Sequence, residues 1–312
     1  MKKVVIALGG NALEKRGLPP TAASQLDVVK ETVEHIANVI ESGCDVIIGH
    51  GNGPQVGRIV LASEAAADVT PAMPFDVCGA MSQGYIGYHL QQALGAALLK
   101  RGIHKPVVSV VTQVAVDKND SAFKNLTKPI GPFYSEAEAK AIEAEKGYAM
   151  KEDAGRGWRR VVASPLPVKI VELPAIKALV AEGAVVIACG GGGIPVVEEN
   201  GVYAGVAAVI DKDFASEKLA EDLDADMFVV LTEVPKVCIN FNKPDQKQLD
   251  KVDTAELAKL ADEGHFAPGS MLPKVKAAMK FADSKPGRTA VISSLEFAKG
   301  ALSGEAGTVI KN

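Results

Sequence analysis

The stretch VVIALGGN (residues 4–11) decides the fold class, because it joins a short apolar run directly to a pair of glycines. Its apolar residues are continuous and do not alternate with polar ones, which is typical of a strand covered by helices on both faces. Five similar runs follow along the chain and are predicted as further strands: residues 45–49, 107–111, 185–189, 228–231 and 289–292.

Helical patterns occupy the segments between these runs. Leu26–Ser42 has apolar residues at spacings of three and four, and the Gly43 that follows is typical of a helix end. Pro174 opens another helix, which ends before Gly183. Three capping boxes predict further helix starts: Ser135 with Glu138, Asp253 with Glu256, and Ser293 with Glu296. The alternation predicts an α/β protein whose mostly parallel sheet carries helices on both faces.

The composition narrows the class of protein. Of the 312 residues, 47% are hydrophobic and 23% are charged, which is typical of a globular chain. A net charge of −4 argues against nucleic-acid binding, which normally needs a basic excess. No apolar stretch reaches the ~20 residues that cross a bilayer, and the run after MKK (residues 1–3) is interpreted as a strand rather than a signal peptide. The four cysteines form no C-x-x-C pair, so we expect no zinc site and a reducing, cytoplasmic location.

One segment interrupts the alternation of strands and helices. Residues 117–160 are polar and contain KPIGP (residues 128–132) and GRGW (residues 155–158). We interpret this segment as an insertion that projects from the sheet. The chain is predicted to form one domain with two lobes, residues 1–165 and 166–312, and the insertion belongs to the first lobe.

Three of the predicted strands lead into glycine-rich loops. These loops are GGN (residues 9–11), GHGNGPQ (residues 49–55) and GGGG (residues 190–193). The carboxyl ends of parallel strands meet at one edge of a sheet, where ligands bind, and glycine lets backbone N–H groups approach an anion closely. We therefore predict an anion site at this edge. The chain has neither the G-x-x-x-x-G-K-[ST] pattern of P-loop enzymes nor a convincing dinucleotide-binding G-x-G-x-x-G.

Three lysines stand in unusual places. Lys212, between Asp211 and Asp213, precedes a predicted helix at 214–223, and Lys274 precedes another at 275–282. Lys128 opens the KPIGP turn of the insertion. A cation at a helix N-terminus opposes the helix dipole, so Lys212 and Lys274 are locally unfavourable unless they serve an anion. For any one lysine taken alone, a solvated surface charge remains the simpler interpretation.

In chain order, these segments resemble the amino acid kinase family, and within it the carbamate kinase branch. The resemblance extends over nearly the whole chain, and the more specific segments are HGNGPQ (residues 50–55), KPIGP and VIDKD (residues 209–213). It implies a three-layer α/β/α sandwich with an open sheet of about eight strands. The first lobe would hold carbamate or carbamoyl phosphate and the second ATP or ADP, with the insertion bringing Lys128 over the site. A homodimer built through the first lobe is also implied, and the long helix predicted at 79–101 fits such an interface or the core.

The resemblance also implies roles for individual residues. Lys128, Lys212, Asp213 and Lys274 would be catalytic. Substrate would be held by Gly9, Gly10, Asn11, Gly51, Asn52, Gly53, Gln55, Gly190 and Gly191, with Gly192 and Gly193 completing the last loop. The nucleotide would contact Gly192, Lys212, Thr232, Val234, Met271, Pro273 and Lys274. Mg²⁺ is expected with the nucleotide, held mainly by its phosphates and water.

Carbamate is already an anion, so its phosphorylation needs no general base, and His50 is interpreted as structural. Two alternatives stay open. A related kinase could act on a larger acid such as acetylglutamate or glutamate, although HGNGPQ and KPIGP favour the smaller substrate. A non-catalytic ligand sensor on the same fold would not need all three lysines and Asp213.

Overall fold

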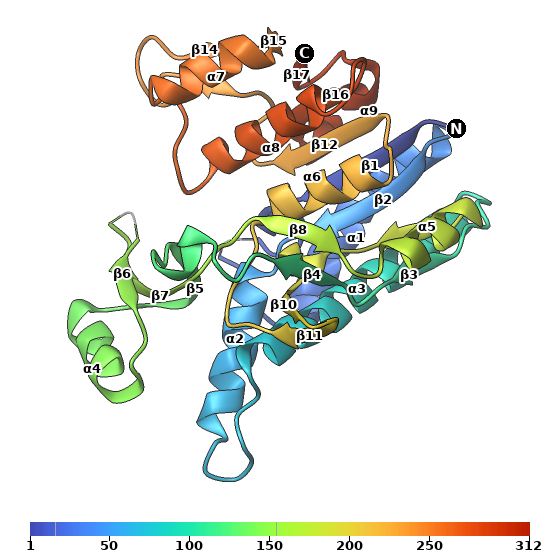
Figure 1. Cartoon of the computed structure of the whole chain (residues 1–312). Coiled ribbons are helices and arrows are strands. Elements are labelled where there is room, and N and C mark those ends of the chain that lie inside the picture. The colour runs from blue at the N-terminus through green and yellow to red at the C-terminus, as the bar shows by residue number, and fades with distance from the viewer. Residues whose placement is uncertain (16, 154) are drawn as a thin grey trace.

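The computed structural model describes residues 1–15, 17–153 and 155–312. An eight-stranded sheet runs through the molecule (Figure 1) in the order β15-β17-β16-β12-β1-β2-β9-β3. These strands are β1 (Lys3–Leu8), β2 (Asp45–His50), β3 (Val107–Ser109), β9 (Val185–Ile187), β12 (Met227–Thr232), β15 (Lys251–Asp253), β16 (Thr289–Ser294) and β17 (Thr308–Lys311). All neighbours are parallel except β16 and β17. The predicted open, mostly parallel sheet of about eight strands is confirmed.

Helices cover both faces of this sheet. Val5 of β1 packs into one core with α5 (Leu173–Ala181), α6 (Lys212–Asp222), α7 (Thr254–Asp262) and α8 (Met271–Asp283). Its neighbours Val4 and Ile6 pack into the other core with α1 (Ala22–Glu41), α3 (Phe75–Lys100) and α9 (Ala298–Ser303). Successive side chains of a strand point to opposite faces, so a continuously apolar strand is needed to fill both cores.

A second, smaller sheet was not predicted from the sequence. Its order is β11-β10-β4-β8, with strands at Val202–Gly205, Ile194–Glu199, Gln113–Val116 and Pro167–Ile170. A two-stranded hairpin, β13 (Cys238–Ile239) with β14 (Lys247–Gln248), adds to the far end of the molecule. In the main sheet β9 lies between β2 and β3, so a strand from beyond residue 165 is embedded among strands from before it.

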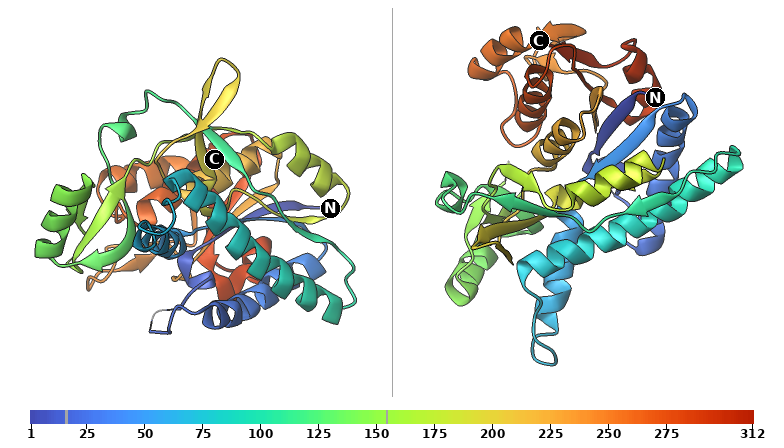
Figure 2. Two further views of the ribbon diagram at one scale, coloured as in Figure 1. Left: turned by 90° about the horizontal axis from the view of Figure 1, so that it is seen from below. Right: turned by 45° about the vertical axis from the view of Figure 1, so that its right-hand side comes forward.

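The insertion folds into a small unit of its own. β5 (Lys128–Tyr134), β7 (Trp158–Val162) and β6 (Met150–Glu152) form a three-stranded antiparallel sheet, and α4 (Glu136–Lys146) packs against it. We call residues 128–162 the protruding subdomain. It stands apart from the main sheet at the lower left of Figure 1, close to α2 (Gly53–Ala65). In Figure 2 the subdomain lies at the left of both views, and α3 runs from beside it toward the other side of the molecule.

Helix starts are the main point of difference from the sequence predictions. Ser135 and Glu138 form the predicted capping box of α4, and Asp253 caps α7. The third box is wrong: Ser293 belongs to β16, and a short 3₁₀ turn (Leu295–Phe297) separates this strand from α9, which begins at Ala298. α6 and α8 both begin earlier than predicted, so Lys212 and Lys274 lie inside their first turns.

Within the described residues, no helix has both the length and the apolar character needed to cross a bilayer. All four cysteines are buried and free, as expected for small apolar side chains.

Candidate functional site

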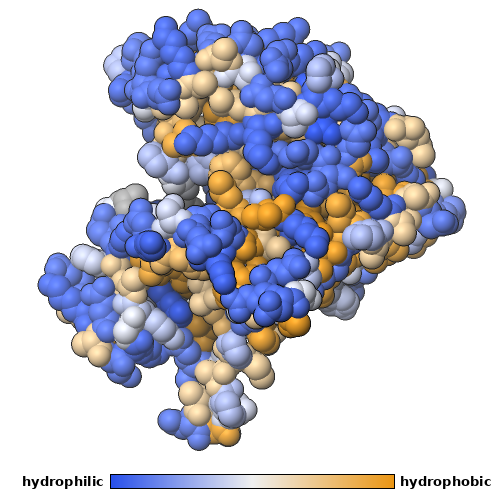
Figure 3. Space-filling model, viewed as in Figure 1, coloured by the Kyte–Doolittle hydropathy of each residue, from blue (hydrophilic) through white to orange (hydrophobic). Residues whose placement is uncertain are grey.

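A cleft of about 670 Å³ lies where β1 and β2 end and where three helices begin. Figure 3 shows the surface hollowed between the protruding subdomain and the C-terminal part of the molecule. The cleft therefore lies at the carboxyl edge of the parallel sheet, as predicted. Its walls are formed by Gly10, Gly51, Asn52, Gly53, Lys128, Pro129, Ile130, Gly191, Val209, Ile210, Asp211, Lys212, Asp213, Gly269, Ser270 and Lys274.

Three helix N-termini converge on this cleft. α2 begins at Gly53 after Asn52, α6 begins at Lys212 after Asp211, and α8 begins after Ser270. The first amides of a helix have no partner within the helix, and its N-terminus carries a partial positive charge. Three such ends around one space make a strong site for an anion.

A buried lysine–aspartate cluster forms one wall. Asp213 Oδ1 lies 2.6 Å from Lys212 Nζ, and Asp213 Oδ2 lies 2.9 Å from Lys274 Nζ. Only 3% of the Asp213 side chain is exposed. Burial alone would raise the pKa of Asp213, but the two ammonium groups outweigh burial and lower its pKa to about 2. One carboxylate thus holds two lysines on the same side of the cleft and leaves a net positive charge there.

The third lysine reaches the cleft from the protruding subdomain. Lys128 Nζ lies 2.6 Å from Asp211 Oδ2. Asp211 also caps α6, because its Oδ1 accepts a hydrogen bond from the Asp213 amide at 2.9 Å. The sequence analysis gave Asp211 no role. The VIDKD segment contained the signal, since an aspartate directly before a helix is a typical N-cap.

The glycines of the three loops do different things. A side chain on Gly10 or Gly53 would meet no protein atom within 4 Å, so both present bare backbone to the cleft. A Cβ on Gly51 would lie 3.2 Å from Lys212 Cδ, so that glycine lets the lysine pass close to the loop. These positions agree with the prediction that backbone N–H groups of the loops approach an anion closely.

The GGGG loop is mostly built for packing. Gly191 lines the cleft with φ +66°, and a Cβ there would lie 2.2 Å from Asn52 Nδ2. A Cβ on Gly192 would lie 2.0 Å from the Ile210 carbonyl oxygen, and one on Gly193 would lie 2.2 Å from Val114. Gly190 packs in the same way against the His50 ring. Of these four, only Gly191 is a wall residue of the cleft.

Polar side chains of α3 and its neighbourhood hold these loops in place. Gln83 Nε2 donates to the Gly190 carbonyl at 3.0 Å, and Gln83 Oε1 accepts from the Thr112 amide at 2.8 Å. Thr112 Oγ1 accepts from the Cys189 amide, and Ser82 Oγ accepts from Asn52 Nδ2 at 2.8 Å. No role was predicted for Ser82, Gln83 or Thr112, since neither a polar residue in a helix interior nor one between two strands has a local signal of its partner.

His50 is buried and neutral. Its Nδ1 lies 2.8 Å from the Gly51 carbonyl oxygen, and burial, together with the nearby Lys212 charge, lowers the pKa of His50 to about 4. His50 does not line the cleft. The geometry agrees with a structural role.

A second pocket of about 650 Å³ adjoins the cleft and shares Ser270 and Lys274 with it. It lies between the end of β12 and the start of α8, and its walls are Thr232, Glu233, Val234, Lys236, Cys238, Phe241, His265, Ala267, Ser270, Met271 and Lys274. Three residues predicted to contact the nucleotide, Thr232, Val234 and Met271, meet here.

Besides Gly190 and Gly192, four predicted site residues lie elsewhere. Pro273 lines a neighbouring groove beneath the protruding subdomain. Gly9 donates its amide to the Leu231 carbonyl and joins β1 to β12. Asn11 is exposed in a 3₁₀ turn, and Gln55 is buried in α2; neither is a wall residue of the cleft or of the second pocket. Among the described residues, no group of three or more His, Cys, Asp or Glu side chains is arranged to bind a metal ion.

Comparison with known proteins gives a consistent result. The sequence profile of the "Amino acid kinase family" matches residues 2–293. The chain is 58% identical to the carbamate kinase of Clostridium perfringens and 54% identical to that of Thermococcus kodakarensis, over 99% of each chain. It superposes on a structure of carbamate kinase from Giardia lamblia bound to AMP-PNP with a TM-score of 0.92 at 46% identity, covering 99% of this chain and 98% of that one.

Proposed function

The chain belongs to the amino acid kinase family, and we propose that it is a carbamate kinase, a phosphotransferase that moves a phosphoryl group reversibly between ATP and carbamate. In the forward direction the bond between the γ-phosphorus and the ADP oxygen breaks, and a bond to a carbamate oxygen forms. The products are ADP and carbamoyl phosphate. Use of the reverse direction, which makes ATP in arginine catabolism, is part of the proposal.

The lysine–aspartate cluster at the junction of the two pockets carries this proposal. Two anions must meet for the phosphoryl group to pass between them, and their repulsion has to be neutralised. Lys274 belongs to both pockets, and Asp213 fixes it beside Lys212. Lys128 reaches the same cleft from the protruding subdomain, where it pairs with Asp211. Carbamate is already ionised, so the cleft needs no base, which agrees with a neutral His50 outside it.

The remaining roles follow from where the pockets lie. We place carbamate or the carbamoyl group against Gly10, Asn52 and Gly53, and the adenosine part of the nucleotide against Val234 and Met271. Mg²⁺ would be held by the nucleotide phosphates and water, because Asp211 and Asp213 are both occupied by lysines. The division into a substrate lobe and a nucleotide lobe, a homodimer and a cytoplasmic location are parts of the same proposal.

The test is production of ATP from ADP and carbamoyl phosphate with Mg²⁺. We expect turnover by the wild type, and loss of at least about a hundredfold in kcat for Lys212→Ala, because it removes one preorganised charge from the transition state. Nucleotide should still bind to that variant. Presenting acetylglutamate or glutamate with MgATP separates the related kinases, since ADP release with one of these acids but not with carbamate would refute the proposal. A wild type that binds nucleotide without turnover would indicate a sensor.

A further inference from the structure

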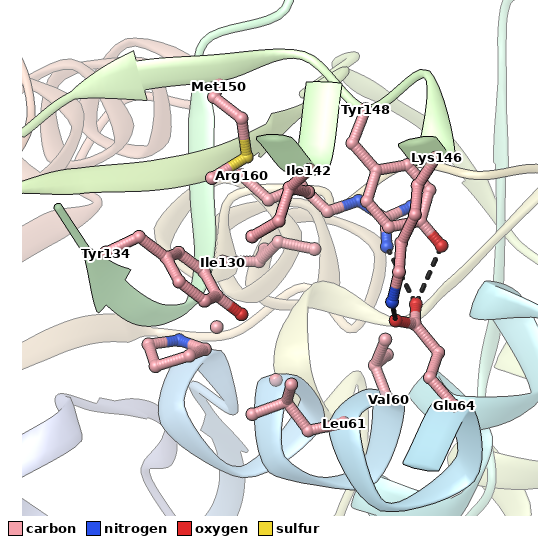
Figure 4. Close-up of a pocket in the computed structure, with 13 residues that line it drawn as sticks. Val60, Leu61, Glu64, Ile130, Tyr134, Ile142, Lys146, Tyr148, Met150 and Arg160 are labelled. Atoms are coloured by element: carbon pink, nitrogen blue, oxygen red, sulfur yellow. Dashed lines mark hydrogen bonds and ion pairs between the residues drawn. The ribbon is translucent and has the colours of Figure 1, made fainter. Parts of the chain in front are cut away.

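The joint between the protruding subdomain and α2 is incompletely filled. A pocket of about 430 Å³ lies between them (Figure 4). Its apolar walls are Val60 and Leu61 on α2 and Ile130, Ile142 and Met150 on the subdomain. Close packing normally fixes how two units sit against each other, and this pocket, which opens to solvent, is a gap in that packing. Contacts around the pocket therefore help to set the orientation of the subdomain.

Glu64, near the end of α2, makes several such contacts. It accepts hydrogen bonds from Lys146 Nζ at 2.6 Å and from the Tyr148 hydroxyl at 2.7 Å, and Arg160 lies 3.7 Å away. Figure 4 shows these side chains converging on its carboxylate. The Arg160 guanidinium also stacks on the Tyr148 ring, 3.5 Å from its centroid. Burial alone would raise the pKa of Glu64, but Lys146 and Tyr148 outweigh it and the pKa is lowered, so the carboxylate is charged.

A second contact between α2 and the subdomain lies where Gly57 and Gly131 line the pocket. A Cβ on Gly57 of α2 would lie 2.3 Å from Gly131 Cα of β5, so the two backbones touch where neither residue has a side chain. This contact has no hydrogen bond of its own to resist rotation. The contacts that hold the subdomain to α2 thus include a backbone contact at Gly57 and a polar anchor at Glu64.

Both points are connected to Lys128 through the paired strands β5 and β7. In the subdomain sheet, Arg160 pairs with Ile130, and Lys128 pairs with Val162 two residues further along the same strands. A rotation about the Gly57 contact would swing Lys128 relative to the cleft, whose wall is the start of the same helix, at Gly53. We infer that Glu64 is a positioning residue: by anchoring Lys146, Tyr148 and Arg160 to α2, it holds Lys128 over the cleft. This inference rests on the role proposed above for Lys128 in phosphoryl transfer.

A double-mutant cycle tests whether Glu64 acts through Lys128. Glu64→Ala should lower kcat about ten- to a hundredfold, the scale expected when a catalytic group is displaced by an ångström or less. The KM for ADP should change little, because the second pocket lies away from the subdomain. In a Lys128→Ala background, Glu64→Ala should cause no further loss. Equal losses in both backgrounds, or no loss in either, would overturn the inference.

Two further variants sharpen the cycle. Glu64→Gln keeps an acceptor for Tyr148 but removes the charge, so it should lose less activity than Glu64→Ala. It also replaces the alanine variant in the cycle should that one fail to fold. Glu136→Ala is the matched control, because Glu136 pairs with Lys140 on the exposed face of α4 in the same subdomain and does not reach α2. It should keep wild-type turnover.

Trp158, the single tryptophan of the chain, lies in β7 and gives a readout that does not depend on turnover. Loss of the anchor should free the subdomain, so the fluorescence anisotropy of Trp158 should fall in Glu64→Ala and not in Glu136→Ala. An unchanged anisotropy would contradict the inference. If the wild type made no ATP, the proposed function would fail, while this measurement would still decide whether Glu64 orients the subdomain.

Discussion

At the scale of single residues, the cleft depends on how Asp213 balances Lys212. Burial lowers the pKa of Lys212 and the Lys274 charge lowers it further, while Asp213 raises it, and the net result is a lowered pKa. Lys212 is charged below that pKa and neutral above it. Turnover that needs this charge should therefore fall as the pH rises into the alkaline range, earlier than an ordinary lysine would require.

Replacing Asp213 makes this dependence visible. Asp213→Asn removes the group that raises the pKa of Lys212, so the alkaline fall in kcat should move to lower pH. The measurement is a pH profile of kcat for the wild type and the variant. Asp222→Asn is the control, because Asp222 pairs with Lys218 on the same helix and not with the cleft lysines. If the pH profile of kcat were the same in Asp213→Asn as in the wild type, the pKa of Lys212 would not determine the fall in kcat.

A local rule marked two of the three lysines, and the family resemblance supplied their roles. A cation in the first turn of a helix is unfavourable, and Lys212 and Lys274 both occupy such positions. Ser82, Gln83 and Thr112 contradict no local rule, so no local pattern marked them. Their roles depend on partners more than 25 residues away, such as Gln83 with Thr112 and Gly190, and only the folded chain brings these together.

At the scale of elements, a second polar contact, away from the cleft, joins α6 and α8. Glu217 Oε2 accepts a hydrogen bond from Lys280 Nζ at 2.5 Å, while Glu217 Oε1 is buried without a partner among the described residues. Burial raises the pKa of Glu217 from near 4.5 to about 7, and the Lys280 charge only partly offsets it. The folded state therefore prefers the protonated form. Stability contributed by this preference is complete below about pH 4.5 and is lost as the pH rises through 7.

Glu217→Gln should remove this dependence. Between pH 5 and pH 8 the wild type should lose about 2–3 kcal/mol of unfolding free energy at this residue that the variant keeps. Urea unfolding at both pH values measures the difference. Glu221→Gln is the control, since Glu221 also contacts Lys280 at 3.3 Å but the pKa of Glu221 is lowered. A Glu217→Gln variant that is less stable than wild type at pH 8 would mean that the ion pair outweighs burial.

Strands marked by continuous apolar runs were predicted well, and strands without such a run were not. Every strand inferred from an apolar run is present in the main sheet, because such runs must be covered on both faces. The strands of the second sheet are less apolar, and Val202 on β11 is exposed. Their pairing joins β4 with β10, nearly 80 residues later in the chain, which no local pattern encodes.

At the scale of the whole molecule, the cleft and the second pocket meet only at Ser270 and Lys274. The cleft collects residues from β1, α2, the protruding subdomain and α6, whereas the second pocket is formed entirely by residues 232–274. The loops that form these pockets come from the ends of adjacent strands, β1 and β12. Two ligands can thus bind side by side, and each contacts mostly different residues of the protein.

This separation predicts that the two substrates respond independently to substitution. Val234 lies in the second pocket, which has no wall residue from the protruding subdomain. Val234→Asp replaces an apolar contact with the adenosine part of the nucleotide by a charged carboxylate. We expect the KM for ADP to rise at least about tenfold, which corresponds to about 1.4 kcal/mol, and the KM for carbamoyl phosphate to stay within about twofold. Steady-state kinetics with each substrate varied in turn measures both values.

Val202→Asp, on the exposed strand β11, is the control for the added charge. If Val234→Asp raised both KM values equally, the pockets would act as one site, and the shared position of Lys274 would no longer explain how the two anions are brought together.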